Sequence, residues 1–262
     1  MTKQRVNLVS GLKIEDAARG SRGLYTVAEV ARYARMPAPR LNYWLYGDRE
    51  HSALHPPTIL RTEGKWLTFL EFVEVLAVRT LRNQYRLSFQ KIRSAVNEAR
   101  DAYGIEYPFA NKDHRTFLIG SDLHIQLRGA LAPVGLTGKD KKQQSFRPCI
   151  EPFMENLEFD DKKTAMAFIA YRYPILNEAG TGKSAIISPT ANAALSATIN
   201  IRMDPRYCFG EPVVEGTGYR ADTLWRAALA ENDMAKAAEY YEVNIHAVAA
   251  ACNYCTEIGM VA

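Results

Sequence analysis

A polar run near the middle of the chain constrains the fold most, because it separates two stretches that can each bury a core. Residues 138–144 consist of glycine, lysine, aspartate and glutamine, with no apolar side chain. This composition cannot form a core and is typical of a connecting segment. We therefore expect a linker over residues 136–147. A chain of 262 residues also accommodates two small cores more naturally than one large core.

Charge divides at the same linker. Residues 1–147 carry 24 Lys and Arg against 14 Asp and Glu, a net charge of +10, whereas residues 148–262 carry 9 against 15, a net charge of −6. The total of +4 conceals this difference. The basic front part is expected to bind a polyanion, and the acidic back part is expected to meet a different partner.

Composition excludes several classes of protein. Apolar residues make up 47% of the chain and charged residues 24%, which is typical of a soluble globular protein. No stretch approaches about 18 consecutive apolar residues, so neither a membrane span nor a membrane partner is expected. The first residues lack the apolar core of a signal peptide, and four cysteines are too few for a disulfide scaffold. A cytoplasmic, reducing location follows as the expectation.

The front part opens with two short predicted helices. Thr26 and Glu29 form a capping box, which starts the first helix. Residues 34–37 break it, and a second helix is expected over residues 37–46, ended by Gly47. Two short helices joined by a tight turn make a helix-turn-helix candidate.

A hairpin and two longer helices are predicted next. Strand-like runs flank Glu63 and Gly64, which are typical of a hairpin turn. Thr68 and Glu71 form a second capping box, and Ser88 can cap the following helix. The long helix after Thr68 is expected to have an apolar side, formed by Phe69, Phe72, Val73 and Leu76. A different stripe of that helix is expected to carry Arg79, Arg82 and Arg86.

The remainder predicts an α+β fold that is mainly α with small β elements. Short strands are expected over residues 115–120, 123–127, 167–171 and 185–187, with a short helix near 151–157. Three helices are expected at the end: residues 221–230, from the cap Asp233 to Tyr241, and from the cap Asn244 onward with Ile245, Val248, Ala249 and Cys252 on one face. The predicted parts are a leader (1–23), a winged helix-turn-helix (24–104), a β segment (105–135), the linker (136–147), a mixed connecting segment (148–203) and a helical domain (204–262).

Two short motifs favour a structural interpretation over a chemical one. Residues 180–184 (GTGKS) resemble the end of a phosphate-binding loop, but Asn177 stands where that loop needs glycine, and a strand-like run follows instead of a helix. We expect a flexible turn there. Cys252 and Cys255 form a CxxC pair at a helix end. Cys208 and His246 could add zinc ligands in principle, but neither sits in a ligand pair, and buried structural thiols are expected.

No catalytic constellation stands out. No serine or cysteine has the sequence context of a nucleophile. The histidines show no metal-ligand spacing: His51, His55, His114, His124 and His246. No catalytic residue, metal or cofactor is therefore predicted, and the chain is not expected to be an enzyme.

The front part resembles the MerR-type winged helix-turn-helix. The matching runs are residues 25–31 (YTVAEVA), 41–44 (LNYW), 64–68 (GKWLT) and 87–93 (LSFQKIR). In such domains a recognition helix enters the major groove and a hairpin wing contacts phosphates. The resemblance implies DNA contacts from Thr26, Ala38, Arg40, Asn42, Tyr43, Arg61 and Lys65. The family commonly has arginine where Asn42 stands, and Arg40 is the expected substitute for its phosphate contact.

The back part resembles the bacterial domain-of-unknown-function family DUF433. The matching runs are residues 203–217 (MDPRYCFGEPVVEGT), 237–241 (AAEYY) and 248–251 (VAAA), and Gly218 stands where the family often has arginine. That family is linked to antitoxins of PIN-type ribonuclease toxins. A winged front joined to this back is similar to the long VapB-type antitoxins, and the run Tyr107-Pro108-Phe109-Ala110 also looks like that architecture.

These resemblances imply a type II antitoxin that binds its own operator DNA as a homodimer and holds a PIN-like ribonuclease toxin. Antitoxins of this kind usually block the acidic toxin site with a basic side chain. The candidates in the back part are Arg202, Arg206, Arg220 and Arg226. The alternative is a stand-alone MerR-like transcription regulator whose C-terminal half binds a small ligand.

Overall fold

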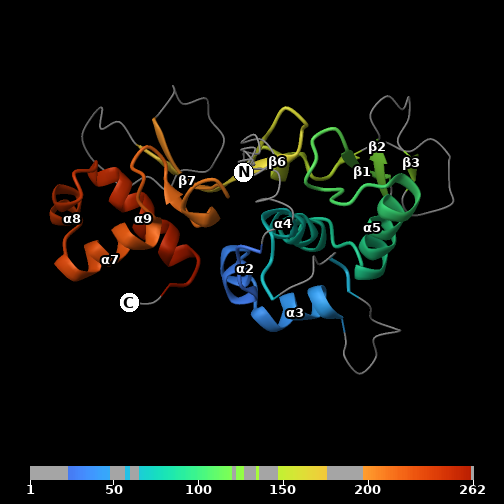
Figure 1. Ribbon diagram of the computed structural model, residues 1–262, viewed down its shortest axis with the longest axis horizontal. Coiled ribbons are helices and arrows are strands. Elements are labelled where there is room, and N and C mark those ends of the chain that lie inside the picture. Colours follow the sequence, from blue (N-terminus) through green and yellow to red (C-terminus); the bar gives the residue numbers. More distant parts are fainter. Residues whose placement is uncertain are drawn as a thin grey trace, which may run out of the picture. The chain divides into compact units, whose positions relative to one another are not determined.

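The computed structural model describes residues 23–47, 57–59, 65–119, 122–126, 134–135, 147–175 and 197–260 (Figure 1). The chain forms two compact units: residues 1–168 with 204–210, and residues 169–203 with 211–262. The fold is α+β with several helices and small sheets, which confirms the predicted class. Some predicted features lie outside the described residues: most of the leader, the hairpin turn at Glu63 and Gly64, nearly all of the linker, the 180–184 turn and the 185–187 strand.

The first unit begins with two short helices, α2 (Val27–Tyr33) and α3 (Ala38–Tyr46). The predicted capping box of α2 is present: the backbone N–H of Glu29 donates to the Thr26 hydroxyl at 3.2 Å, and the Glu29 carboxylate accepts from the Thr26 N–H at 2.7 Å. Gly47 ends α3 with a positive φ of 71°, as its lack of a side chain permits. The order of helix, turn and helix is therefore as predicted.

Helix α4 (Phe69–Asn83) forms the centre of the first unit. Its predicted capping box, between Thr68 and Glu71, is confirmed. The four residues expected on its apolar side are buried, and so is every other residue from 69 to 78, including two glutamates. Such all-round burial is typical of a helix enclosed by other elements, not of one lying on a surface.

Helix α5 (Phe89–Tyr103) begins at the predicted cap Ser88 and packs beside a small antiparallel sheet. The strand order is β3 (Val134–Gly135), β2 (Asp122–Gln126), β1 (Arg115–Ile119) and β4 (Arg147–Pro148). An ion pair between Lys91 Nζ and the Asp122 carboxylate, 3.1 Å long, joins α5 to β2. Both strands predicted in this region are confirmed within a residue or two of their bounds.

The first unit is completed by segments from further along the chain. These are the short helix α6 (Glu151–Met154), strand β5 (Leu157–Phe159), the first part of β6 (Ala165–Pro174) and the turn η1 (Cys208–Gly210). The Tyr25 hydroxyl donates a buried hydrogen bond of 2.8 Å to the Gly210 carbonyl. Residues 204–210 thus pack with the first unit, although they open the part that the sequence assigns to the C-terminal domain.

The second unit combines a small sheet with three helices. The remaining part of β6 lies next to β7 (Thr198–Met203), which pairs with β8 (Val213–Val214). The helices α7 (Ala221–Glu231), α8 (Met234–Tyr240) and α9 (Ile245–Glu257) pack together (Figure 1). Asp233 and Asn244 cap α8 and α9 as predicted.

The predicted inner face of α9 needs a correction. Of the four residues expected to share it, only Val248 is buried, whereas Ile245 is 43% exposed. The buried residues of α9 are Ala247, Val248, Ala250, Ala251, Tyr254 and Cys255. The helix therefore turns a different stripe toward α7 and α8 than its sequence suggested. No helix in the described ranges is long and apolar enough to cross a membrane.

Candidate functional site

The best-defined candidate surface lies on α3. Leu41, Trp44 and Leu45 are buried on one side of this helix, and Arg40 and Asn42 are exposed on the other. The Trp44 carbonyl also accepts hydrogen bonds from the backbone N–H groups of residues 58 and 59, at 2.9 and 3.3 Å. The helix is therefore held along one face and presents its polar face to solvent.

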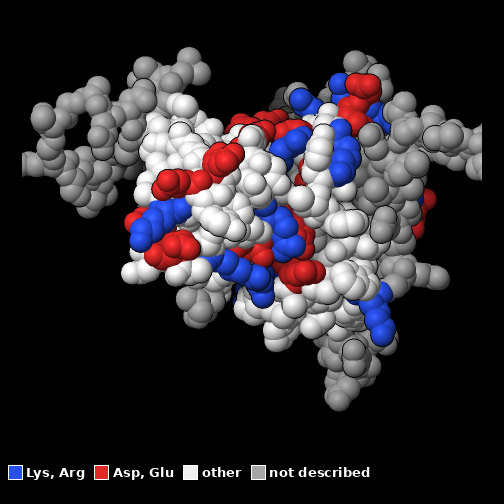
Figure 2. All heavy atoms as spheres, turned by 60° about the vertical axis from the view of Figure 1, so that its left-hand side comes forward, with Lys and Arg blue, Asp and Glu red and all other residues white. Residues whose placement is uncertain are grey.

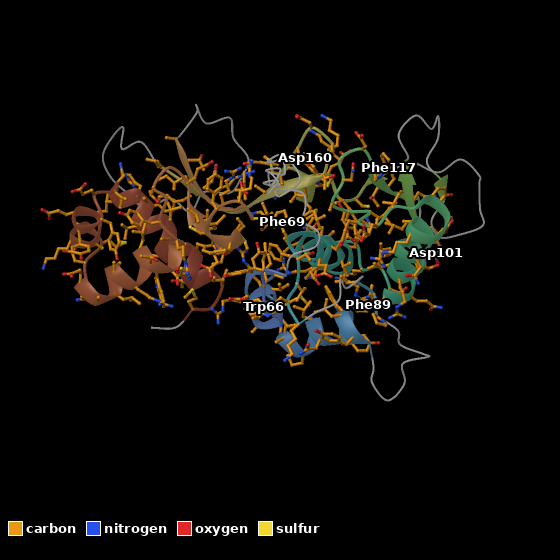
Figure 3. All side chains as sticks on the ribbon, viewed as in Figure 1. Trp66, Phe69, Phe89, Asp101, Phe117 and Asp160 are labelled. Carbon is orange, nitrogen blue, oxygen red and sulfur yellow. The ribbon has the colours of Figure 1, made fainter. Side chains whose placement is uncertain are left out.

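Phe89 reinforces this anchoring from the start of α5 (Figure 3). Its ring meets Trp44 edge-on, with 5.2 Å between ring centroids, and meets Tyr43 in the same way at 6.1 Å. Tyr43 is consequently half-buried, so its predicted role in DNA binding is limited to the exposed part of its ring. Ala38, at the first turn of α3, is also half-buried.

Lys65 lies beside the start of α2. The Leu67 N–H donates to the Tyr25 carbonyl at 2.7 Å, and the Tyr25 N–H donates back to the Leu67 carbonyl at 3.0 Å. This short antiparallel bridge brings the residues before α4 against the residues before α2. Lys65 and Trp66 are exposed next to it, and Trp66 is labelled in Figure 3. The other predicted wing residue, Arg61, lies outside the described residues.

Thr26 is used within its own helix cap. Its hydroxyl donates to the Glu29 carboxylate at 2.8 Å and accepts from the Glu29 N–H. Of the predicted DNA-binding residues that the structure describes, the exposed ones are Arg40, Asn42 and Lys65. Arg32 and Arg35 are exposed as well, on α2 and in the turn after it, and were not among the predicted DNA-binding residues. Their position beside the turn was the available signal.

The predicted arginine stripe on α4 does not form. Arg86 lies beyond the end of the helix, in a left-handed conformation with φ of 52°. Arg82 donates to the Leu87 carbonyl at 2.5 Å, and its guanidinium lies 4.4 Å from the centroid of the Phe89 ring. Burial lowers the pKa of Arg79. Arg82 is thus engaged with Leu87 and Phe89, and Arg79 is half-buried.

The four candidate toxin-blocking arginines have different environments. Arg206, in the first unit, forms a bidentate pair with the buried Asp204 carboxylate, with nitrogen-to-oxygen distances down to 2.7 Å. In the second unit, Arg202 is half-buried on β7, and Arg220 is paired with Glu211 and Asp222. Arg226 has a side chain 69% exposed, with one carboxylate oxygen of Asp222 at 3.4 Å. Arg226 is therefore the best placed of the four to reach a partner protein.

Acidic and basic side chains are mixed on the face drawn in Figure 2, where Lys and Arg lie among Asp and Glu. The net charges of the two units still differ in sign: the first unit has 27 Lys and Arg against 20 Asp and Glu, and the second has 6 against 9. The difference between the two parts is smaller than the division at the linker suggested, because acidic residues 151–161 belong to the first unit.

The cysteines are free thiols, and two of them are fully buried. Burial raises the pKa of Cys149 and of Cys255 to about 12, so both remain protonated at neutral pH. Cys252, the partner of Cys255 in the CxxC pair, is half-buried. Within the described ranges, no three His, Cys, Asp or Glu side chains gather as ligands for a metal ion.

Comparisons with known proteins bear on the fold but give no function. No family profile matches the chain. The uncharacterized protein Rv2308 of Mycobacterium tuberculosis is 30% identical over 92 residues, which make up 34% of this chain and 39% of Rv2308. The crystal structure of Rv2018 from Mycobacterium tuberculosis matches 89% of this chain and 99% of its own, with a TM-score of 0.51 and 18% identity. At that level of identity the likeness supports a shared fold alone.

Proposed function

We propose that this protein is an antitoxin of a type II toxin–antitoxin system, which binds operator DNA through its first unit and a PIN-like ribonuclease through its second. The single observation that carries the DNA half is α3, a helix anchored by Leu41 and Trp44 that exposes Arg40 and Asn42. A surface helix with this pattern, preceded by a short helix and a tight turn, suits insertion into a major groove.

Lys65 and the basic residues around the α2–α3 turn support the same assignment. Lys65 is held near the start of α2 by the Tyr25–Leu67 bridge, and Arg32 and Arg35 are exposed on the same two-helix element. Basic side chains around a recognition helix contact phosphates and set its position on the duplex. Two such units on a palindromic operator would act as a homodimer.

The toxin half of the proposal rests on the DUF433-like resemblance and on Arg226. This side chain is the most exposed of the candidate arginines, on a unit whose net charge is negative. An exposed guanidinium can pair with carboxylates that would otherwise hold the metal of a PIN-like ribonuclease. The proposed partner is therefore a small ribonuclease encoded beside this gene.

The DNA half is tested by the double substitution Arg40→Ala and Lys65→Ala. Both side chains are exposed, so the variant is expected to fold normally. Its affinity for DNA from upstream of its own gene is expected to fall by roughly 100-fold or more at physiological salt, measured by fluorescence anisotropy.

A matched control removes the same charge elsewhere in the first unit. Lys162→Ala with Lys163→Asn lies in the turn before β6, where both lysines are exposed and Lys163 has a φ of 62° that asparagine tolerates. This control is expected to bind DNA almost as tightly as the unmodified chain. Equal affinities of the unmodified chain and the Arg40→Ala, Lys65→Ala variant would refute the proposed DNA surface.

A ligand-responsive transcription regulator is the second candidate function. A pocket of about 480 Å³ in the second unit favours it, with Glu215, Tyr219, Glu242 and Asn244 among its lining residues. Pockets of this size hold small molecules. The two candidates differ in one observable property: only an antitoxin forms a stable complex with the product of a neighbouring ribonuclease gene.

A further inference from the structure

The first unit contains a second, larger pocket of about 550 Å³, which neither proposed function uses. It lies between residues 109–116, helix α6 and strand β5. Figure 3 labels Phe117 and Asp160, which directly follow lining residues in the sequence. Its lining is apolar in part, from side chains such as Phe109, Ile150 and Phe159. Lys112, His114 and Glu151 supply polar groups. Apolar walls with a few polar groups are typical of small-molecule sites.

Backbone hydrogen bonds hold one wall of this pocket in place. The Phe109 N–H donates to the Glu74 carboxylate of the buried helix α4 at 2.9 Å. The Ala110 carbonyl accepts from the Ala165 N–H at 2.7 Å, and the Lys112 N–H donates to the Lys163 carbonyl at 2.8 Å. The run 107–110, which the sequence singled out, is therefore attached to two other elements. A wall supported in this way keeps its shape before any ligand binds.

His114 provides a buried polar atom on the pocket wall. Its Nδ1 is inaccessible to solvent and has no hydrogen-bond partner among the residues that the structure describes. Burial lowers the pKa of this imidazole, so the ring is neutral at neutral pH. His114 also lines an adjoining pocket of about 340 Å³.

The charged groups of the pocket have both signs. The Lys112 ammonium lies 5.6 Å from the centroid of the Phe159 ring. Two carboxylates also line the pocket, from Glu151 at the start of α6 and from Glu155 directly after this helix, and both residues are exposed. A ligand with a single charge would be attracted by one set of these groups and repelled by the other. A ligand with both charges can satisfy them together.

We propose that this pocket binds a small zwitterion with an apolar body, of the chemical class of the apolar and aromatic α-amino acids. Its carboxylate would pair with Lys112, its ammonium with Glu151 and Glu155, and its side chain would contact Phe109 and Ile150. The site is independent of the DNA and toxin surfaces, so its test stands apart from theirs.

The test is isothermal titration calorimetry on the full chain with three matched probes. L-Phenylalanine carries both charges, 3-phenylpropanoate lacks the ammonium group, and phenethylamine lacks the carboxylate. L-Phenylalanine or L-leucine is expected to bind at sub-millimolar concentration, and each single-charge probe is expected to bind roughly tenfold more weakly than L-phenylalanine or worse. If neither amino acid gives a heat of binding at concentrations up to about 10 mM, the proposal is wrong.

Variants assign the charged contacts. Lys112→Met keeps the apolar stem without the charge and is expected to weaken amino-acid binding by roughly tenfold, while leaving phenethylamine unaffected. The control Lys162→Ala removes an exposed lysine outside the pocket lining and is expected to leave every affinity unchanged. Unchanged amino-acid affinity in Lys112→Met, or equal affinity for phenethylamine and L-phenylalanine, would contradict the assigned site.

Discussion

Glu74 is the residue whose environment departs most from what its type predicts. It is buried within α4, and burial raises the pKa of its carboxyl from the ordinary 4.5 to about 8. The Phe109 N–H and the nearby charge of Arg100 offset only part of this effect. At neutral pH the side chain is therefore mostly protonated, and it still accepts the hydrogen bond that holds the 107–110 run.

The stability of the chain should consequently fall as pH rises from about 5 to about 8. A carboxyl with a raised pKa binds its proton more tightly in the folded state, so unfolding becomes easier between the two pKa values, by about 1.4 kcal/mol per pH unit at most. Glu74→Gln keeps an acceptor for Phe109 and is expected to flatten this dependence. Urea unfolding across that pH range measures it, and identical profiles for both proteins would contradict the assignment.

Arg206 and Arg226 should respond differently to the same substitution. Arg206→Ala leaves the buried Asp204 carboxylate without its bidentate partner, and the free energy of unfolding is expected to fall by about 2 kcal/mol. Arg226→Ala removes one exposed pair and is expected to change it by less than about 0.5 kcal/mol. In the proposed complex, however, Arg226→Ala is the variant expected to weaken toxin inhibition. A large loss of stability in Arg226→Ala, together with little change in Arg206→Ala, would refute both roles.

For single residues, the sequence predicts those roles that depend only on residues close by in the chain. The caps at Thr26, Thr68, Ser88, Asp233 and Asn244 are all confirmed, because each side chain bonds to a backbone group two or three positions away. The role of Glu74 depends on residue 109, which is far along the chain, and no local pattern announces it.

At the scale of elements, the contact between Tyr25 and Gly210 joins the start of α2 to the η1 turn. A Cβ atom at Gly210, where φ is 78°, would lie 2.2 Å from the Tyr25 hydroxyl oxygen. Gly210→Ala is therefore expected to lower the free energy of unfolding by about 3 kcal/mol, from the clash together with backbone strain. Chemical unfolding followed by tryptophan fluorescence measures this change.

Gly104→Ala serves as the control for that substitution. Gly104 also has a positive φ, 64°, but no atom lies within 4 Å of the position of its Cβ. The expected cost is about 1 kcal/mol, from backbone conformation alone. Equal costs at the two glycines would show that η1 does not pack against Tyr25.

The elements themselves were largely predictable, and their surroundings were not. Helices α2, α3, α7 and α8 begin and end close to their predicted bounds, and α5 begins at its predicted cap, because caps and breakers are local signals. The all-round burial of α4 was missed, since it depends on aromatic contacts such as Phe72 with Tyr25 and with Phe168. The end of α4 at Asn83, which separates Arg86 from Arg82, carries no glycine or proline to signal it.

At the scale of the whole molecule, the net charge of each unit underlies the partner that we expect it to bind. If the first unit binds DNA through phosphate contacts, the logarithm of the binding constant should fall linearly with the logarithm of salt concentration, since bound counterions are released. Removing Arg40 and Lys65 is expected to make that slope shallower by about 2. A slope that is unchanged in this variant would place the phosphate contacts on another surface.

The proposed neutralisation of a ribonuclease can be measured with purified proteins. The product of the neighbouring gene is purified, and its cleavage of RNA is followed as increasing amounts of the full chain are added. Ribonuclease activity is expected to disappear near a one-to-one ratio and to return when the Arg226→Glu variant replaces the unmodified chain. Undiminished RNA cleavage at a large excess of the unmodified chain would contradict it.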